Sequence, residues 1–115
     1  MKELNARQIG IAQGNEDVFS EFETGGDMWT GSGDRERRKT VMFERAYRRP
    51  PNVQVTLSLW DMDTTAFVRA DLRAEKITCD GFDLVFRTWA DTRIARVRMA
   101  WMAIGELPSD DDWQV

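Results

Sequence analysis

Apolar and polar side chains alternate with a period of two along much of the chain, and this pattern predicts strands. In the run NVQVTLSLW at 52–60, the valines and leucines point to one face, and the polar residues and Trp60 point to the other. Few windows space apolar residues three and four apart, as an amphipathic helix would. Similar runs lie at 6–14, 39–45, 65–75, 81–92 and 93–104. Six short strands at this spacing favour an all-β fold, a six-stranded antiparallel β-sandwich.

The breaks between these runs carry residues that are typical of turns. Pro50 and Pro51 end one segment, because proline cannot join the ladder of a central strand. Asp80 and Gly81 stand between two alternating runs and predict a hairpin. A glycine-rich loop is expected at 24–34.

Two side chains break the inward and outward pattern of otherwise regular strands. In GFDLVFRTWADT at 81–92, the phenylalanines point inward, whereas Trp89 falls on the polar face. Arg69 likewise lies on the polar face of its run, in which Val68 and Ala70 point inward. An outward tryptophan costs hydration free energy unless a neighbouring protomer covers it or a ligand stacks on it. A sugar suits such a platform, since arginine donates to its hydroxyls and a carboxylate accepts from them. The pattern alone leaves both explanations open.

Composition removes several classes of function. The chain has no histidine, which excludes Ser-His and Cys-His nucleophile systems and histidine metal sites. Cys79 is the single cysteine, so no intrachain disulfide can form. The net charge of −4 argues against nucleic acid as a partner. No apolar run approaches the roughly 20 residues that span a bilayer, and the first residues lack the apolar centre of a signal peptide, although a removed leader would leave no trace.

The 115 residues are expected to form one domain over 1–107, followed by an acidic tail over 108–115.

Other motifs support weaker hypotheses. Asp61 and Asp63 could hold a divalent cation, but aspartates after a strand more often form a turn. The basic cluster RERRK at 35–39 is interpreted as a solvated edge strand. No cofactor is predicted, and an enzyme is less favoured than a binding or interaction module.

The region from about Val41 to Gly105 closely resembles the H-type lectin domain. The resemblance rests on motifs whose order and spacing make chance agreement improbable. These motifs are Pro50-Pro51 before a strand, Leu59-x-Asp61, Arg69, the I-T-x-x-G-F segment at 77–82, Trp89-x-Asp91-Thr92, and Trp101-Met102-Ala103-Ile104-Gly105.

This resemblance implies a non-catalytic lectin that binds N-acetylgalactosamine or galactose in clefts between protomers of a trimer, which in some members stacks into a hexamer. Trp89 matches the tryptophan that packs against the sugar, and Arg69 matches the arginine that contacts it. An acidic contact from the glycine-containing loop falls on Ser32 without a gap or on Asp34 with a small gap. Asp34 is preferred, because a carboxylate can accept from two vicinal hydroxyls. Asp91 of the W-x-D-T motif completes the implied site.

Two positions depart from the family pattern. Ala90 replaces a histidine of the snail lectins, and Phe67 replaces a frequent asparagine. An alternative is therefore an oligomerisation or adaptor module, for example of a surface or phage tail protein, that has lost sugar binding. The implied trimer also predicts that Arg96 and Arg98, which share one strand face, meet a neighbouring protomer.

Overall fold

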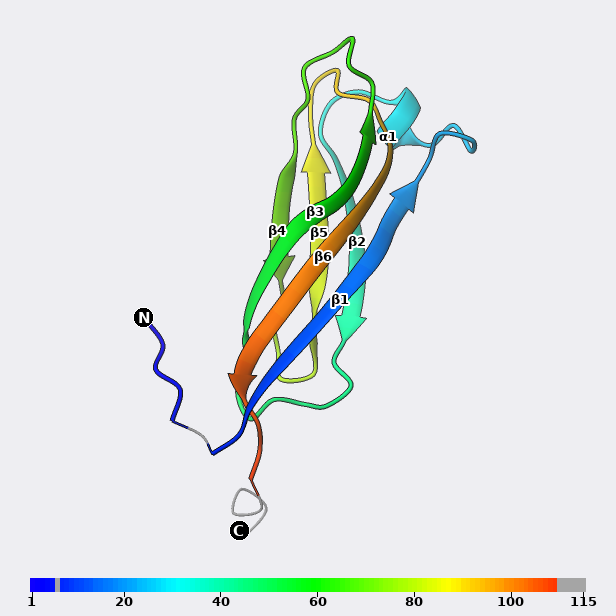
Figure 1. Ribbon diagram of the computed structural model, residues 1–115. Coiled ribbons are helices and arrows are strands. Elements are labelled where there is room, and N and C mark those ends of the chain that lie inside the picture. The colour runs from blue at the N-terminus through cyan, green and yellow to red at the C-terminus, as the bar shows by residue number, and fades with distance from the viewer. Residues whose placement is uncertain (6, 110–115) are drawn as a thin grey trace.

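The computed structural model describes residues 1–5 and 7–109 and shows an all-β protein with one short helix. Residues 110–115 of the predicted acidic tail lie outside the described residues. Two antiparallel sheets lie one over the other, with α1 and the loops at 63–70 and 89–93 at one end and the loop at 43–51 at the other (Figure 1). The elements are β1 (Ile9–Ser20), α1 (Asp27–Thr30), β2 (Arg35–Met42), β3 (Asn52–Met62), β4 (Asp71–Glu75), β5 (Gly81–Thr88) and β6 (Ile94–Glu106).

Each sheet has three strands, and the most apolar strand is central in each. The strand orders are β1-β6-β3 and β2-β5-β4. Because a central strand is the least exposed to solvent, β5 and β6 supply most of the core. The inward-facing positions predicted for both strands are confirmed. The predicted hairpin is also confirmed, because β4 and β5 are consecutive and pair antiparallel around Asp80. The core side chains of these two strands are Phe82, Leu84, Phe86, Ile94, Val97, Met99, Trp101 and Ala103.

Val85 shows how the outer face of the second sheet is built. It lies on the outer face, as its phase requires, yet it is fully buried. Arg38 and Arg73 stand opposite it in register on the two flanking strands. Long arginine stems cover apolar surface while their charged ends stay in water. Charged residues on this face therefore also shield an apolar centre.

The expected phase of β3 is wrong at its end. A β-bulge between Leu57 and Leu59 inserts one residue relative to β6. Leu59 consequently pairs with Arg98 on the outer face instead of pointing into the core. Trp60 shifts to the phase of the core, but it remains 60% exposed because β3 is an edge strand. A bulge reverses every later side chain of its strand, which alternation alone does not reveal.

The strand expected over 65–75 is also shorter than predicted. It begins only at Asp71, and Val68 and Ala70 are exposed rather than inward. Side chains from the end of β5 and from the turn after it hold the segment before β4: Thr88 Oγ1 donates to the carbonyl of Arg69 at 2.7 Å, and Thr92 Oγ1 donates to that of Phe67 at 2.6 Å. These bonds satisfy the backbone of 67–69 without a ladder.

The basic cluster at 35–39 is not a uniformly solvated edge. It lies in β2, and its first residue, Arg35, is buried. Arg37 and Lys39 reach the carboxylates of Glu21 and Glu16 at the rim between the sheets. Paired inward charges on an edge strand still hinder pairing with another chain. Within the described residues, no helix has the length and apolar character to cross a bilayer.

Candidate functional site

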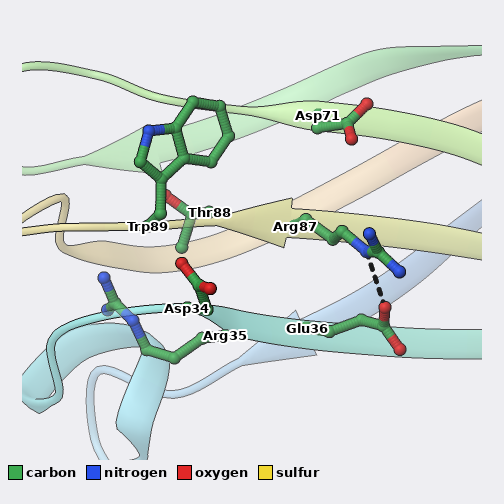
Figure 2. A pocket seen from close by; sticks show the side chains of 7 residues that line it. All are labelled: Asp34, Arg35, Glu36, Asp71, Arg87, Thr88 and Trp89. Carbon is green, nitrogen blue, oxygen red and sulfur yellow. Dashed lines mark hydrogen bonds and ion pairs between the residues drawn. The ribbon is translucent and has the colours of Figure 1, made fainter.

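A cavity of about 390 Å³ opens where β5 ends, at the end of the sandwich that carries α1. Trp89 and Asp34, both predicted as site residues, line it together (Figure 2). The other lining residues come from β2, β4 and β5 and were not predicted. They are Arg35, Glu36, Asp71, Arg87 and Thr88.

Trp89 follows the last residue of β5 and keeps 41% of its surface exposed. The chain turns directly after it, at Ala90, whose φ of 58° is in the left-handed region. The carbonyl of Ala90 accepts a 2.9 Å hydrogen bond from the backbone N–H of Gly33. This bond ties the turn after Trp89 to the glycine loop that ends at Asp34. The two predicted residues are therefore brought together by loops that are far apart in the sequence.

Arg35 holds the same two loops together through hydrogen bonds. Its guanidinium is buried and donates to the carbonyls of Ala90 and Thr92 on one side, at 3.2 and 2.8 Å. It also donates to the carbonyls of Asp27, Met28 and Gly33, at 3.1, 3.3 and 2.9 Å. A planar guanidinium can serve five acceptors at once, which an ammonium cannot. Arg35 is thus a positioning residue that sequence reasoning missed, because a basic run gave no sign of burial.

Asp34 offers an unoccupied carboxylate. It is exposed, and within the described residues it makes no hydrogen bond or ion pair. Both oxygens are therefore free to accept from a ligand. Ser32 is exposed in the same loop but does not line the cavity.

Arg69 and Asp91 form a pair of their own outside the lining of the cavity. Arg69 Nη1 donates to Asp91 Oδ1 at 2.7 Å and to Thr92 Oγ1 at 3.2 Å. The hydrogen bond from Arg69 lowers the pKa of Asp91 below its ordinary value of 3.8. The Arg69 guanidinium also lies 5.7 Å from the ring centroid of Phe67. The structure thus divides the predicted site into Trp89 with Asp34 in the cavity and Arg69 with Asp91 apart from it.

A row of three charged residues crosses the sheet next to Trp89. Glu36, Arg87 and Asp71 stand opposite one another in register on β2, β5 and β4 (Figure 2). Arg87 Nε donates to Glu36 Oε1 at 2.7 Å. Hydrogen bonds from Arg38 and Arg87 lower the pKa of Glu36 below its ordinary value of 4.5. Each member of the row lies two positions from a predicted site residue, a signal that becomes useful only once the strand register is known.

Asp61 and Asp63, the two weaker candidates for binding a divalent cation, each pair with a different arginine. Asp61 lies 3.4 Å from Arg96 Nε, and Asp63 lies 3.2 Å from Arg93 Nη1. Asp63 Oδ1 also accepts from the backbone N–H and the hydroxyl of Thr65, the turn arrangement that its position after a strand favours. No group of three or more acidic or cysteine side chains in the described ranges is placed to hold a metal ion.

Comparison with known proteins adds a family and a fold. The model of the H-type lectin domain matches residues 38–104. A protein of Fuscovulum blasticum named ATP synthase subunits region ORF 7 is 51% identical over 107 residues, which cover 93% of each chain. That name gives a gene region and no activity. A discoidin-1 chain of Dictyostelium discoideum is 33% identical over 100 residues, which cover 84% of this chain and 38% of that protein.

Solved structures of discoidin II from Dictyostelium discoideum share the fold. The wild-type structure has a TM-score of 0.75 at 22% identity, over 88% of this chain and 38% of discoidin II. The native recombinant structure has a TM-score of 0.76 at 21% identity, over 91% and 40%. The present chain therefore spans well under half of the discoidins that it matches.

Proposed function

Because this chain belongs to the H-type lectin domain family, we propose that it binds carbohydrate without altering it chemically, and that its ligands carry N-acetylgalactosamine or galactose. One observation supports this most: a half-exposed indole, Trp89, stands beside the free carboxylate of Asp34 in one cavity. The indole offers a stacking face for the C–H side of a galactose-type ring. The carboxylate can accept from two vicinal hydroxyls at once.

Arg69 and Asp91 have the second role in this proposal. Arg69 donates to sugar hydroxyls that extend beyond the cavity, and Asp91 holds its guanidinium in place. The pair is bound to the W-x-D-T turn through Thr92, so it moves with the platform of Trp89. Ser32 has a peripheral place, because it lies in the loop but not at the cavity.

We further propose that the protein assembles as a homotrimer, with a stacked hexamer as its larger form. The outer face of the β1-β6-β3 sheet supports this. Ile11 is 62% exposed there and stands opposite Ile104 in register, beside Met102 of the central strand. Water-exposed apolar side chains on a regular sheet suit contact with a second copy of the chain. Several sugar sites on one assembly gain roughly 10² to 10⁴ in avidity.

Arg96 and Arg98 lie on the same outer face, at the end nearer the cavity. Within their own chain, Arg96 pairs with Asp61, and Arg98 Nε donates to Ser58 Oγ at 3.2 Å. Their proposed contacts with a neighbouring protomer therefore add to interactions that the monomer already has.

A direct experiment tests sugar binding. The protein is passed over immobilised N-acetylgalactosamine and immobilised mannose, and the retained fraction is challenged with free sugars. Retention on the first resin, with elution by free galactose or N-acetylgalactosamine, is expected. A glycan array without any signal at high protein concentration contradicts the proposal.

The alternative is an oligomerisation or adaptor module without sugar binding. It is favoured by the engagement of Arg69 with Asp91 and by the exposed Phe67 beside it. Sedimentation separates the two: an oligomer that ignores every glycan on the array is the result that the alternative predicts.

A further inference from the structure

We propose that the cavity beside Trp89 contains a second subsite, formed by Arg87 and Asp71, that takes a second uncharged sugar unit. The protein then prefers a disaccharide or longer glycan to a monosaccharide. This inference rests on the proposed function, since it assigns the ligand class of the same cavity.

Arg87 and Asp71 lie where a second sugar unit beside Trp89 would reach them. Trp89 and Arg87 are two residues apart at the end of β5, and Asp71 stands opposite Arg87 on β4. Two strand positions advance about 6.8 Å along a sheet, which is comparable with one sugar unit. The cavity of about 390 Å³ includes all three residues. Cavities of roughly 300–1,000 Å³ hold ligands larger than one hexose.

Arg87 and Asp71 both have polar atoms without a partner in the described residues. Arg87 bonds Glu36 through Nε, and its two terminal nitrogens make no hydrogen bond or ion pair with the described residues. Asp71 accepts from Arg73 through Oδ2 at 3.0 Å, and Oδ1 has no partner in the described part of the chain. Arg87 thus offers donors and Asp71 an acceptor, side by side. A sugar hydroxyl both donates and accepts, so this pairing suits it.

The charged side chains around the cavity favour a neutral sugar. Three carboxylates line the cavity, but Glu36 is already paired with Arg38 and Arg87, and Asp71 with Arg73, which leaves Asp34 as the lining carboxylate with no partner in the described residues. The guanidinium of Arg35 donates all five N–H groups to backbone carbonyls, so it has no free donor to offer an anionic sugar. A sialic acid or sulfated sugar would meet the free carboxylate of Asp34 and no guanidinium without a carboxylate or carbonyl partner, whereas a neutral sugar is not repelled. The second unit is therefore uncharged.

The experiment compares monosaccharide and disaccharide affinities in one titration series. Calorimetry measures Kd for N-acetylgalactosamine, for galactose and for a panel of neutral disaccharides that end in either sugar. The readout is the ratio of monosaccharide Kd to the best disaccharide Kd. We expect a ratio of at least about tenfold, which corresponds to about 1.4 kcal/mol. Sialylated or sulfated forms of the best disaccharide should lose most of this gain.

Arg87→Gln, which shortens the side chain and removes the guanidinium donors, and Asp71→Asn, which removes the charge at nearly the same shape, should each bring the ratio close to one. Arg45→Gln is the matched control, because Arg45 is exposed and does not line this cavity, and it should keep the wild-type ratio. Thermal unfolding of each variant shows whether the fold is retained, and the two independent variants keep the test decisive if one fails to fold.

Two failures are distinguishable. Monosaccharide binding with a ratio near one in the wild type, or a ratio that both variants leave intact, overturns the second subsite and leaves the proposed function standing. No binding of any monosaccharide or disaccharide overturns both.

Discussion

Arg69 and Asp91 are joined by a 2.7 Å hydrogen bond between Nη1 and Oδ1, although 22 residues separate them in the chain. The bond connects the irregular segment before β4 to the turn after Trp89. It holds the guanidinium outside the lining of the cavity, whereas the resemblance by itself implies that Arg69 contacts the sugar.

Asp91 should titrate below its ordinary pKa of 3.8, because the hydrogen bond from Arg69 favours the charged carboxylate. A lowered folded-state pKa means that the pairing is present at higher pH and is lost as the pH falls through that value. Carboxyl NMR should show a midpoint for Asp91 below 3.8, and Arg69→Gln should move it upward. An unchanged midpoint in that variant would show that the pair does not persist in solution.

Trp89→Ala should abolish retention on N-acetylgalactosamine resin, because it removes the stacking face. Circular dichroism and oligomer size should stay as in the wild type, since the indole is half-exposed at a strand end. Trp60→Ala is the matched control: this tryptophan is exposed on the other sheet and does not line the cavity. Equal loss of binding in both variants would remove Trp89 from the site.

Arg35→Lys should destabilise the protein by at least about 2 kcal/mol, because buried carbonyls that lose their partner cost roughly 1–3 kcal/mol each. Lysine keeps the charge but cannot serve the five carbonyls that Arg35 bonds. Urea unfolding measures the loss. Arg73→Lys, at an exposed position on β4, should change stability little. Equal stability of the two variants would contradict the anchoring role of Arg35.

Met102→Glu should dissociate the proposed trimer, because it places a charge at the centre of the β1-β6-β3 outer face. Burying an unpaired charge costs several kcal/mol. Met42→Glu introduces the same side chain at an exposed position on the other sheet and should leave assembly intact. Sedimentation velocity compares the three proteins. A trimer that survives Met102→Glu would place the interface on another face.

Gly14→Ala should destabilise the fold by about 1–3 kcal/mol, the usual cost of overpacking. A Cβ at this position would collide with the Trp101 indole, which packs in the core directly against the glycine. Gln13→Ala, one residue away on the exposed face, is the control. Equal melting temperatures for the two variants would show that the indole can move aside at little cost.

The chain by itself determined the all-β class, most of the strands and the face on which most of their side chains lie. Period-two alternation suffices for this, because burial of one face rewards every second residue. It also singled out Trp89, since a large aromatic residue on a polar face stands out in a regular strand. Its motifs carried the resemblance that the family match confirms.

Only the tertiary structure decided which residues share the cavity. Alternation assigns a face but not a register, so the row of Glu36, Arg87 and Asp71 could not be read before the strands were paired. A bulge moved Leu59 to the opposite face with no sign in its sequence. Arg35 became buried because carbonyls of α1 and of the adjoining glycine loop converge on it together with two from the distant turn after β5. Such contacts depend on how loops far apart in the chain meet, and local patterns contain no information about that.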